Sequence, residues 1–250
     1  MIIDDIAKIL KKIAISRGIT LVEYGIGTLY AYAIVRENNK RAIGVAFVPR
    51  EDITRGTYIE NASINDVDKL VSSYNIAEKC VGVAILNAIS QLLIKEEKFL
   101  TRGLLELIEF KPNDLVVVIG NMVPIVRALE KRKIKTIVLE RNPLFRSEDT
   151  LPDCLIKRVL PKATVCIVTG ATLVNDTIDL IIDYSKNCRI RAIIGPTAQI
   201  LPEIFFDLGF THVASLKITD IEKAKWAIIH GGGARIIEKH GIKYVCTREN

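Results

Sequence analysis

Short, almost fully apolar runs recur through the C-terminal half of the sequence, and segments with helical periodicity separate most of them. Because nearly every residue in such a run is apolar, each run is expected to be a strand buried on both faces, as in parallel sheets. The pattern therefore predicts an α/β domain with a Rossmann-like parallel sheet between helices. The predicted strands are Leu115–Ile119, Thr136–Leu139, Thr164–Val168, Ala192–Ile194 and His212–Leu216, and the predicted helices cover 124–133, 174–186, 201–208 and 220–230.

The N-terminal part of the chain follows a different pattern. It begins with an amphipathic helix, continues with two apolar segments on either side of an Asn-rich turn, and ends with two further helices. The predicted elements are a helix over 4–17, a hairpin of 28–36 and 41–49, and helices over 64–75 and 76–96. The chain is therefore expected to contain a smaller α+β domain, 1–97, followed by the Rossmann-like domain, 98–250.

Composition limits the classes of partner. Hydrophobic residues make up 49% of the chain and charged residues 26%, which is typical of a globular protein. The net charge of +6 comes from basic residues that are interspersed with acids. No RNA-binding aromatic signature or zinc-finger spacing accompanies them. We therefore expect no nucleic-acid partner.

The sequence also predicts a cytoplasmic protein without a membrane span. No stretch holds the about 18 consecutive apolar residues that a membrane helix needs. Asp4 and Asp5 lie where a signal peptide would be basic. The five cysteines form no CxxC pair, which is typical of reduced, structural thiols. Scarce Gln together with abundant Ile, Lys, Glu and Arg is typical of a thermophile.

Small and polar residues follow four of the predicted strands. In open α/β sheets, ligands bind at these carboxyl ends, where glycine allows close approach and helix N-termini favour anions. The candidate ligand-binding residues at the strand ends are Gly120, Glu140, Asn142, Thr169, Gly170, Thr172, Asn175, Gly195 and Pro196.

Glu140 lies twenty residues after Gly120, at the end of the second predicted strand. In dinucleotide-binding domains an acid at this spacing binds a ribose hydroxyl. The first turn, Gly120-Asn-Met-Val-Pro124, lacks the GxGxxG pattern and leaves little room for a pyrophosphate. A ribose contact and a surface acid are both compatible with Glu140.

The segment from Thr169 to Asn175 is the strongest candidate for ligand contacts. Thr169 and Thr172 can donate hydroxyl hydrogen bonds, and Asn175 can both donate and accept. An alternative role of Asn175 is to cap the helix that follows. Asn87, on a predicted helix of the first domain, is expected to face the same cleft, because clefts between domains are favoured ligand sites.

Taken together, these residues resemble the putative heavy-metal chelation domain family. The resemblance rests on the segments 140–143, 160–161, 169–178, 195–198, 201–209, 231–233 and 243–244, with a companion N-terminal domain suggested by 82–91. It implies an enolase-N-terminal-like domain joined to a Rossmann-like domain, with the site in the cleft between them. Both expectations agree with the fold predicted from periodicity.

Direct metal chelation is poorly supported by the residues. A soft-metal site needs clustered thiolates or imidazoles, and His212, His230 and His240 are not at ligand spacing. Cys166 lies inside a predicted strand and is expected in the core. A hard-cation site is an alternative, although acidic loops are more often solvated. Its ligands would be Glu140, Glu148, Asp149 and Asp153. No residue is therefore predicted as a direct metal ligand.

The glycine run after His230 resembles a hydrolase oxyanion loop. The Gly-x-Ser-x-Gly elbow that accompanies such a loop is absent from the sequence, so a hydrolase is excluded. The glycines Gly231–Gly233 are instead predicted to end the helix 220–230, and Asp220 is predicted to cap its beginning.

The leading functional hypothesis is a cleft that binds a small anionic or nucleotide-like ligand, linked to heavy-metal chelation or metallophore metabolism. One alternative is an enzyme that uses a nucleotide-type cofactor, S-adenosylmethionine or NAD. Another is a non-catalytic carrier of a metal or metabolite. The sequence identifies no cofactor and no catalytic residue, and it is compatible with a homo-oligomer.

Overall fold

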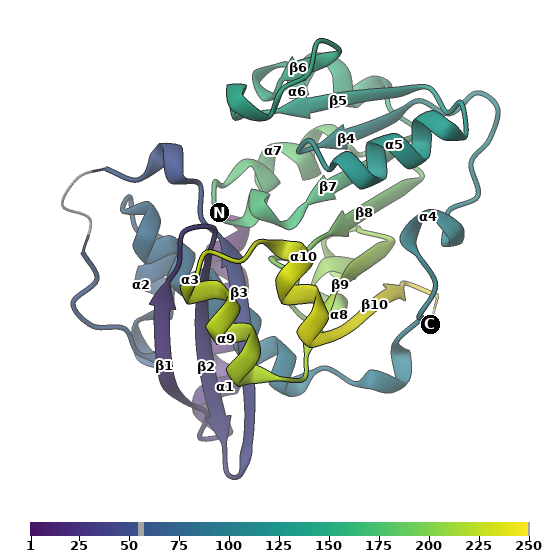
Figure 1. Cartoon of the computed structure of the whole chain (residues 1–250). Coiled ribbons are helices and arrows are strands. Elements are labelled where there is room, and N and C mark those ends of the chain that lie inside the picture. Colours follow the sequence, from purple (N-terminus) through teal and green to yellow (C-terminus); the bar gives the residue numbers. More distant parts are fainter. Residues whose placement is uncertain (55–57, 250) are drawn as a thin grey trace.

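A computed structural model describes residues 1–54 and 58–249, which form two sheets with their helices (Figure 1). The smaller sheet is antiparallel, in the order β1-β2-β3. The expected helix and hairpin are present, whereas β1 was not predicted. The N-terminal elements are α1 (Ile2–Ser16), β1 (Thr20–Ile26), β2 (Tyr30–Glu37), β3 (Lys40–Phe47), α2 (Val67–Val71) and α3 (Ile76–Leu93).

Helix α3 is the core of the N-terminal half. Among the described residues it is the one helix long and apolar enough to span a membrane, but 78% of it is buried inside the protein, as expected for a core helix. It crosses β3 at Gly44, where a Cβ atom would lie 2.0 Å from the backbone nitrogen of Ala88. Only glycine permits this direct contact between helix and strand backbones.

The larger sheet has seven strands in the order β10-β9-β8-β7-β4-β5-β6, and all neighbours are parallel except β9 and β10. This is the Rossmann strand order: β5 and β6 are added on one side of β4, and β7 to β10 are added on its other side, so the strand order reverses between β4 and β7. The predicted fold class is confirmed; β6 and β10 were not predicted. The strands are β4 (Val116–Ile119), β5 (Thr136–Glu140), β6 (Thr150–Pro152), β7 (Val165–Thr169), β8 (Ile190–Ile194), β9 (His212–Ile218) and β10 (Gly241–Thr247).

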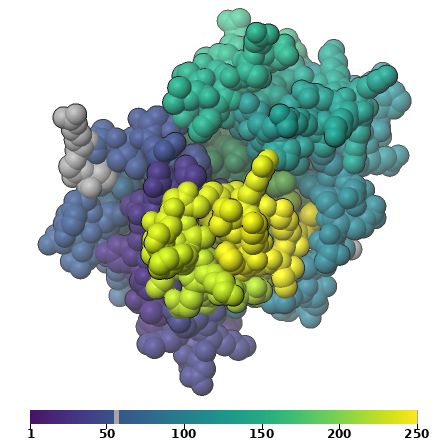
Figure 2. All heavy atoms as spheres, viewed as in Figure 1, coloured from purple at the N-terminus to yellow at the C-terminus, as the bar shows by residue number. Residues whose placement is uncertain are grey.

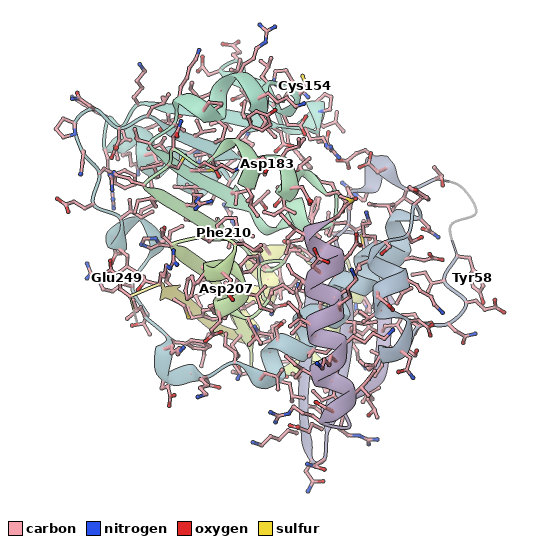
Figure 3. The ribbon with its side chains drawn as sticks, turned by 180° about the vertical axis from the view of Figure 1, so that it is seen from behind. Tyr58, Cys154, Asp183, Asp207, Phe210 and Glu249 are labelled. Atoms are coloured by element: carbon pink, nitrogen blue, oxygen red, sulfur yellow. The ribbon has the colours of Figure 1, made fainter. Side chains whose placement is uncertain are left out.

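Helices cover both faces of this sheet because alternate residues of each strand point to opposite sides. Val117 and Val168 pack in the core that includes α6, α7 and α8, whereas Val118 packs against α4 and α5. Figure 3 shows, from behind, the face that α6, α7 and α8 cover, with Asp183 on α7 and Asp207 at the end of α8. These helices are α4 (Leu104–Leu107), α5 (Val123–Lys131), α6 (Ile156–Val159), α7 (Thr177–Tyr184) and α8 (Pro202–Asp207).

The C-terminal helices cross back onto the N-terminal sheet. Helices α9 (Ile221–Ile229) and α10 (Ala234–Ile237) cover the face of that sheet opposite α3, as Figure 1 shows. Ile228 and Ile237 pack there against Tyr30, Tyr32 and Ile34. The two halves therefore share two hydrophobic interfaces: this one, and the core cluster in which α1 and α3 are joined with β7 and α7. Short 3-10 helices complete the fold: η1 (Arg50–Asp52), η2 (Ile64–Asp66), η3 (Glu96–Lys98), η4 (Pro143–Phe145), η5 (Asp153–Leu155), η6 (Leu160–Lys162), η7 (Gly170–Leu173) and η8 (Glu238–His240).

Buried side chains also connect the edge strand β3 to the loop after β8. Gln199 Oε1 accepts from the Val45 amide at 2.8 Å, and Thr197 Oγ1 accepts from the Phe47 amide at 2.9 Å. Asn87 Nδ2 donates to the carbonyls of Val45 and Thr197, at 2.7 and 2.9 Å. These bonds satisfy backbone groups of the edge strand β3 that have no partner strand, and they fix the position of the loop after β8.

Candidate functional site

The carboxyl ends of β4 and β7 meet at the point where the strand order reverses. Gly120 directly follows β4 and has a φ of +90°, and a Cβ atom there would lie 2.7 Å from Thr169 Cγ2. A cavity of about 370 Å³ opens at this edge and is lined by the loops after β4, β5, β7 and β8. Figure 2 shows the surface hollowed between the teal segment, which holds β4 to β6, and the purple and yellow segments below it. Ligands of open α/β sheets bind in this position.

The cavity gathers most of the residues singled out in the sequence, although they come from four separate loops. Their expected contact with a ligand stays a prediction. Those that line the cavity are Gly120, Glu140, Asn142, Thr169, Thr172, Asn175, Gly195 and Pro196.

Gly170 and Asn87 lie outside the cavity lining. Gly170 is buried, and a Cβ atom there would lie 2.5 Å from the backbone nitrogen of Ala198, so glycine is needed for two loops to touch. Asn87 is fully buried and binds Val45 and Thr197, as described above. Neither residue lies on the cavity wall, and both serve packing between segments; their expected contact with a ligand stays a prediction.

The N-terminal half contributes walls that sequence reasoning missed. Tyr30, Phe47, Pro49 and Glu51 line the cavity. Their contribution depends on how β2 and β3 dock against the large sheet, which local periodicity does not reveal. Phe145 also lines the cavity. Its position three residues after Asn142 was the one available sequence signal.

Glu140 joins two of the loops. Its Oε2 accepts from the Asn121 amide at 2.7 Å, and its Oε1 accepts from the Asn142 amide at 2.8 Å. Asn121 Nδ2 donates to the carbonyl of Phe145 at 2.6 Å, which reinforces the same connection. Each carboxylate oxygen has a second lone pair, so Glu140 can still accept from a ligand hydroxyl.

The beginning of α5 has little capacity for an anion. The amide of Asn121 is bound to Glu140, that of Met122 donates to Gly120 O at 2.7 Å, and that of Val123 donates to Asn121 O at 3.0 Å. Pro124 has no N–H. Because these donors are occupied, the position that holds a diphosphate in dinucleotide-binding domains is closed.

The charges of the residues that line the cavity also disfavour an anionic ligand. Glu51, Glu140 and Asp153 line it together with a single cation among the described lining residues, Arg141. Arg141 is paired with Asp153, with 3.0 Å between Nε and Oδ2. The lining is therefore net negative, which disfavours a small anion and favours a neutral or cationic molecule.

The loop after β7 retains free hydrogen-bonding capacity. Thr172 Oγ1 donates to Thr169 O at 2.8 Å, and Asn175 Oδ1 accepts from the amide and hydroxyl of Thr177 at 3.2 and 2.7 Å. Asn175, one residue before the N-cap Asp176, therefore caps the first amide of α7 in an Asx turn. Among the described residues, Asn175 Nδ2 and the hydroxyl hydrogens of Thr169 and Thr197 have no acceptor. These three groups are available to a ligand.

The candidate metal ligands do not form a metal centre. In the part of the chain that the structure describes, no three His, Cys, Asp or Glu side chains form a group that could hold a metal ion. Cys166 is 1% exposed, and burial raises the pKa of its thiol, so its expected place in the core is confirmed.

The glycine run is structural, as predicted. The amides of Gly231 and Gly232 donate to Ile228 O and Ala227 O at 3.1 and 2.7 Å, which ends α9 in a Schellman motif. Asp220 Oδ1 accepts from the Lys223 amide at 3.1 Å and caps the beginning of α9.

Comparison with known proteins identifies the family. A family model described as putative heavy-metal chelation, DUF364, matches residues 103–247, and a second model with the same description, DUF4213, matches residues 7–90. An uncharacterised protein of Methanocaldococcus jannaschii is 32% identical over 236 residues, which is 92% of this chain and 90% of that protein.

Two crystal structures share the fold. A protein with unknown function from the DUF364 family of Pyrococcus horikoshii has a TM-score of 0.92 and 35% identity, covering 99% of this chain and 100% of that one. A DUF364 protein of unknown function from Desulfitobacterium hafniense has a TM-score of 0.76 and 19% identity, covering 98% of both chains. The chain therefore belongs to the DUF364 family of putative heavy-metal chelation proteins, as its sequence motifs indicated.

Proposed function

We propose that the protein binds a small, ring-bearing organic molecule of nucleoside-like chemistry in the cavity at the strand-order reversal. The observation that carries the proposal is the cavity itself, which has a volume of about 370 Å³ and lies at the carboxyl ends of the neighbouring strands β4 and β7. This volume and position are typical of sites for small molecules and cofactors in α/β folds.

The walls supply complementary chemistry. Phe47, Met122 and Phe145 offer apolar surface for a planar ring. Glu140 can accept hydrogen bonds from hydroxyl groups, and Asn175 can donate one. The ligand is therefore expected to carry hydroxyl groups at the β5 end of the cavity, and to be neutral or cationic because the lining is net negative.

Among nucleotide-type cofactors, S-adenosylmethionine fits this site better than NAD. The sulfonium cofactor carries a nucleoside and a positive charge but no diphosphate, whereas the diphosphate of NAD needs the free amides that α5 lacks. An enzyme using S-adenosylmethionine is therefore the second candidate function. The donor atoms of the ligand, rather than side chains of the protein, would then hold a heavy metal; the described residues contain no group of three His, Cys, Asp or Glu side chains that could hold one.

The test is native mass spectrometry with elemental analysis, complemented by calorimetric titration with adenosine and S-adenosylmethionine. Ala171→Leu fills the cavity without removing a side-chain hydrogen bond, because Ala171 lines it with a methyl group alone. Thr20→Leu, at an exposed position of β1, is the matched control.

We expect the wild type and Thr20→Leu to bind, and Ala171→Leu to lose at least roughly tenfold in affinity with its melting temperature unchanged. Equal affinity in Ala171→Leu would place the ligand elsewhere. A wild-type protein that retains no organic mass and binds neither probe would refute the proposal.

A further inference from the structure

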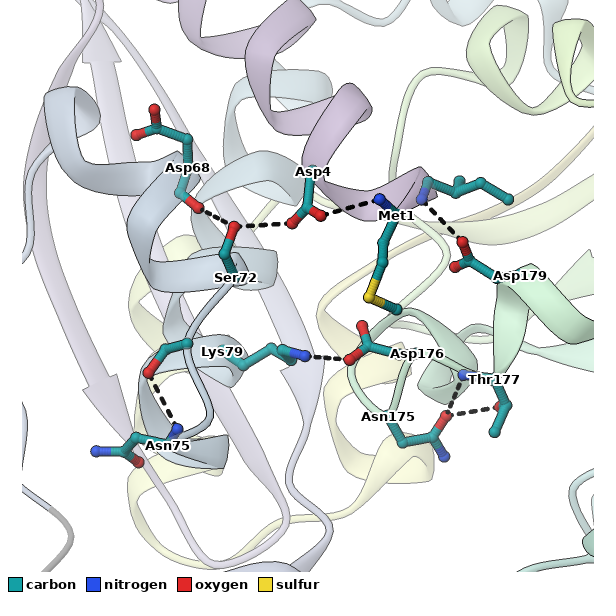
Figure 4. Close-up of polar contacts among 12 residues, drawn as sticks. Met1, Asp4, Asp68, Ser72, Asn75, Lys79, Asn175, Asp176, Thr177 and Asp179 are labelled. Carbon is teal, nitrogen blue, oxygen red and sulfur yellow. Dashed lines mark hydrogen bonds and ion pairs between the residues drawn. The ribbon is translucent and has the colours of Figure 1, made fainter.

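Asn175, Asp176 and Thr177 form a sharp reversal between η7 and α7. Asp176 has a φ of +61°, which lies in the left-handed region. This conformation costs free energy for any residue that has a side chain. Its neighbours Asn175 and Thr177 both line the cavity. Asp176 itself turns away from them, towards α3 (Figure 4). The unusual backbone therefore separates two cavity-lining residues from one that faces the other half of the protein.

The contacts of Asn175 fix the orientation of its carboxamide. The Thr177 amide can only donate, so the atom that it contacts at 3.2 Å must be the oxygen of Asn175. The nitrogen end then points away from Thr177, as Figure 4 shows. No described residue accepts a hydrogen bond from this nitrogen. Asn175 thus presents a free donor on the wall of the cavity.

Asp176 is held by a cation from the N-terminal half. Lys79 Nζ on α3 forms an ion pair with Asp176 Oδ2, and the Lys79 side chain is only 10% exposed. Other carboxylates face the same interface: Asp4 accepts from Ser72 at 2.8 Å, and Asp179 accepts from the Ile2 amide at 3.1 Å. Figure 4 shows Lys79 directed at Asp176 within this acidic surrounding. Its positive charge and the Met1 ammonium, which is paired with Asp4 at 3.1 Å, together offset the negative charge beside the loop.

Resting on the proposed function, we propose that the Lys79–Asp176 ion pair positions Asn175, so that Asn175 Nδ2 donates to the bound molecule. The ligand accordingly carries a hydrogen-bond acceptor, a carbonyl oxygen or a ring nitrogen, at the α7 end of the cavity. Lys79 and Asp176 are positioning residues: neither lines the cavity, and they act through Asn175. The N-terminal half thereby controls a ligand contact made by the C-terminal half.

The donor is tested with Asn175→Asp. The aspartate keeps an oxygen for the amide and hydroxyl of Thr177, so the cap and the melting temperature should be preserved. The nitrogen donor is lost, and we expect affinity for adenosine, measured by calorimetry, to fall at least roughly tenfold. Unchanged affinity in a folded Asn175→Asp protein would overturn the assignment of the donor.

The positioning role is tested with Lys79→Met alone and combined with Asp176→Asn. The single variant leaves a half-buried carboxylate unpaired, whereas the double variant removes that charge and keeps a residue that tolerates left-handed backbone. Lys69→Met is the matched control, because Lys69 is ion-paired to Asp66 but its side chain is 79% exposed.

The readouts are the hydrogen-exchange rate of the Thr177 amide and the affinity for adenosine. We expect the double variant to regain thermal stability while Thr177 still exchanges roughly tenfold faster and adenosine binds roughly tenfold more weakly than in wild type. If the Thr177 amide of the double variant exchanges at the wild-type rate and adenosine binds with wild-type affinity, the Lys79–Asp176 ion pair only stabilises the fold and does not position Asn175. Failure of the wild type to bind adenosine counts against the proposed function, whereas the exchange rate tests the positioning separately.

Discussion

The seven-stranded sheet uses similar polar residues in opposite ways at its amino edge, where the parallel strands begin, and at its carboxyl edge, where they end. At the amino edge, Asp114 accepts from the Lys111 amide and the Thr164 hydroxyl, each at 2.7 Å, and forms an ion pair with Arg189. Thr164 Oγ1 in turn accepts from the Leu115 amide at 3.0 Å. This cluster satisfies its carboxylate entirely from within the protein.

The carboxyl edge is only partly satisfied. Glu140 binds two loop amides there, but Asn175 Nδ2 and the hydroxyl hydrogens of Thr169 and Thr197 have no acceptor among the described residues. A fully satisfied polar cluster contributes to stability, whereas unused donors beside a cavity suit a ligand. The comparison predicts that substitutions at the amino edge change stability alone and that those at the carboxyl edge also change binding.

The largest effect on stability is expected for Asp114→Ala. The substitution removes the carboxylate partner of the Arg189 guanidinium and leaves the Lys111 amide unsatisfied, which should lower the free energy of unfolding by roughly 3 kcal/mol in urea denaturation. Adenosine affinity should not change. Asp66→Ala, which removes an exposed ion pair and a hydrogen bond from the Ser63 hydroxyl, should lower the free energy of unfolding far less, because solvent screens the exposed charges. A loss of affinity in Asp114→Ala would break the distinction between the edges.

The next effect is a loss of stability in acid. Burial raises the pKa of Asp114, but hydrogen bonds from Arg189, Lys111 and Thr164 outweigh it and lower the pKa to about 2, from the usual 3.8. Because the folded pKa is the lower one, this stabilisation is present above pH 4 and is lost as the pH falls to about 2.

The difference in pKa corresponds to about 2 kcal/mol. Other carboxylates titrate in the same range, so the measurement is the difference between wild type and Asp114→Asn in urea denaturation from pH 5 to 2. We expect the gap in stability between the two proteins to narrow by about 2 kcal/mol. A constant gap would show that Asp114 titrates normally.

A smaller effect on stability, with a larger one on binding, is expected for Glu140→Ala. The amides of Asn121 and Asn142 lose their acceptor but can reach water through the cavity, so the cost should be roughly 1 kcal/mol. Adenosine affinity should fall at least roughly tenfold, because a carboxylate acceptor for ligand hydroxyls is lost. Stability loss without a change in affinity would make Glu140 the counterpart of Asp114, and the two edges would then be alike.

Much of the fold could be predicted because it depends on local patterns. The apolar runs that became β4, β5, β7, β8 and β9 are buried on both faces in any covered parallel sheet. The hairpin of β2 and β3 follows from its turn, where Asn38 adopts a φ of +52°. By contrast, β1 contains a bulge between Leu21 and Glu23, and β10 begins with exposed residues, so neither has a regular alternation to detect.

The sequence by itself determined the buried strands β4, β5, β7, β8 and β9, the β2–β3 hairpin and the edge of the sheet where polar residues collect, since each depends on neighbours along the chain. Only the tertiary structure decided which of those polar atoms remain free. Thr197 binds Phe47, 150 residues away, and Lys79 binds Asp176 across 97 residues. Hydrogen-bonding capacity is consumed by whichever group lies within about 3 Å, and that group is set by how the two halves pack.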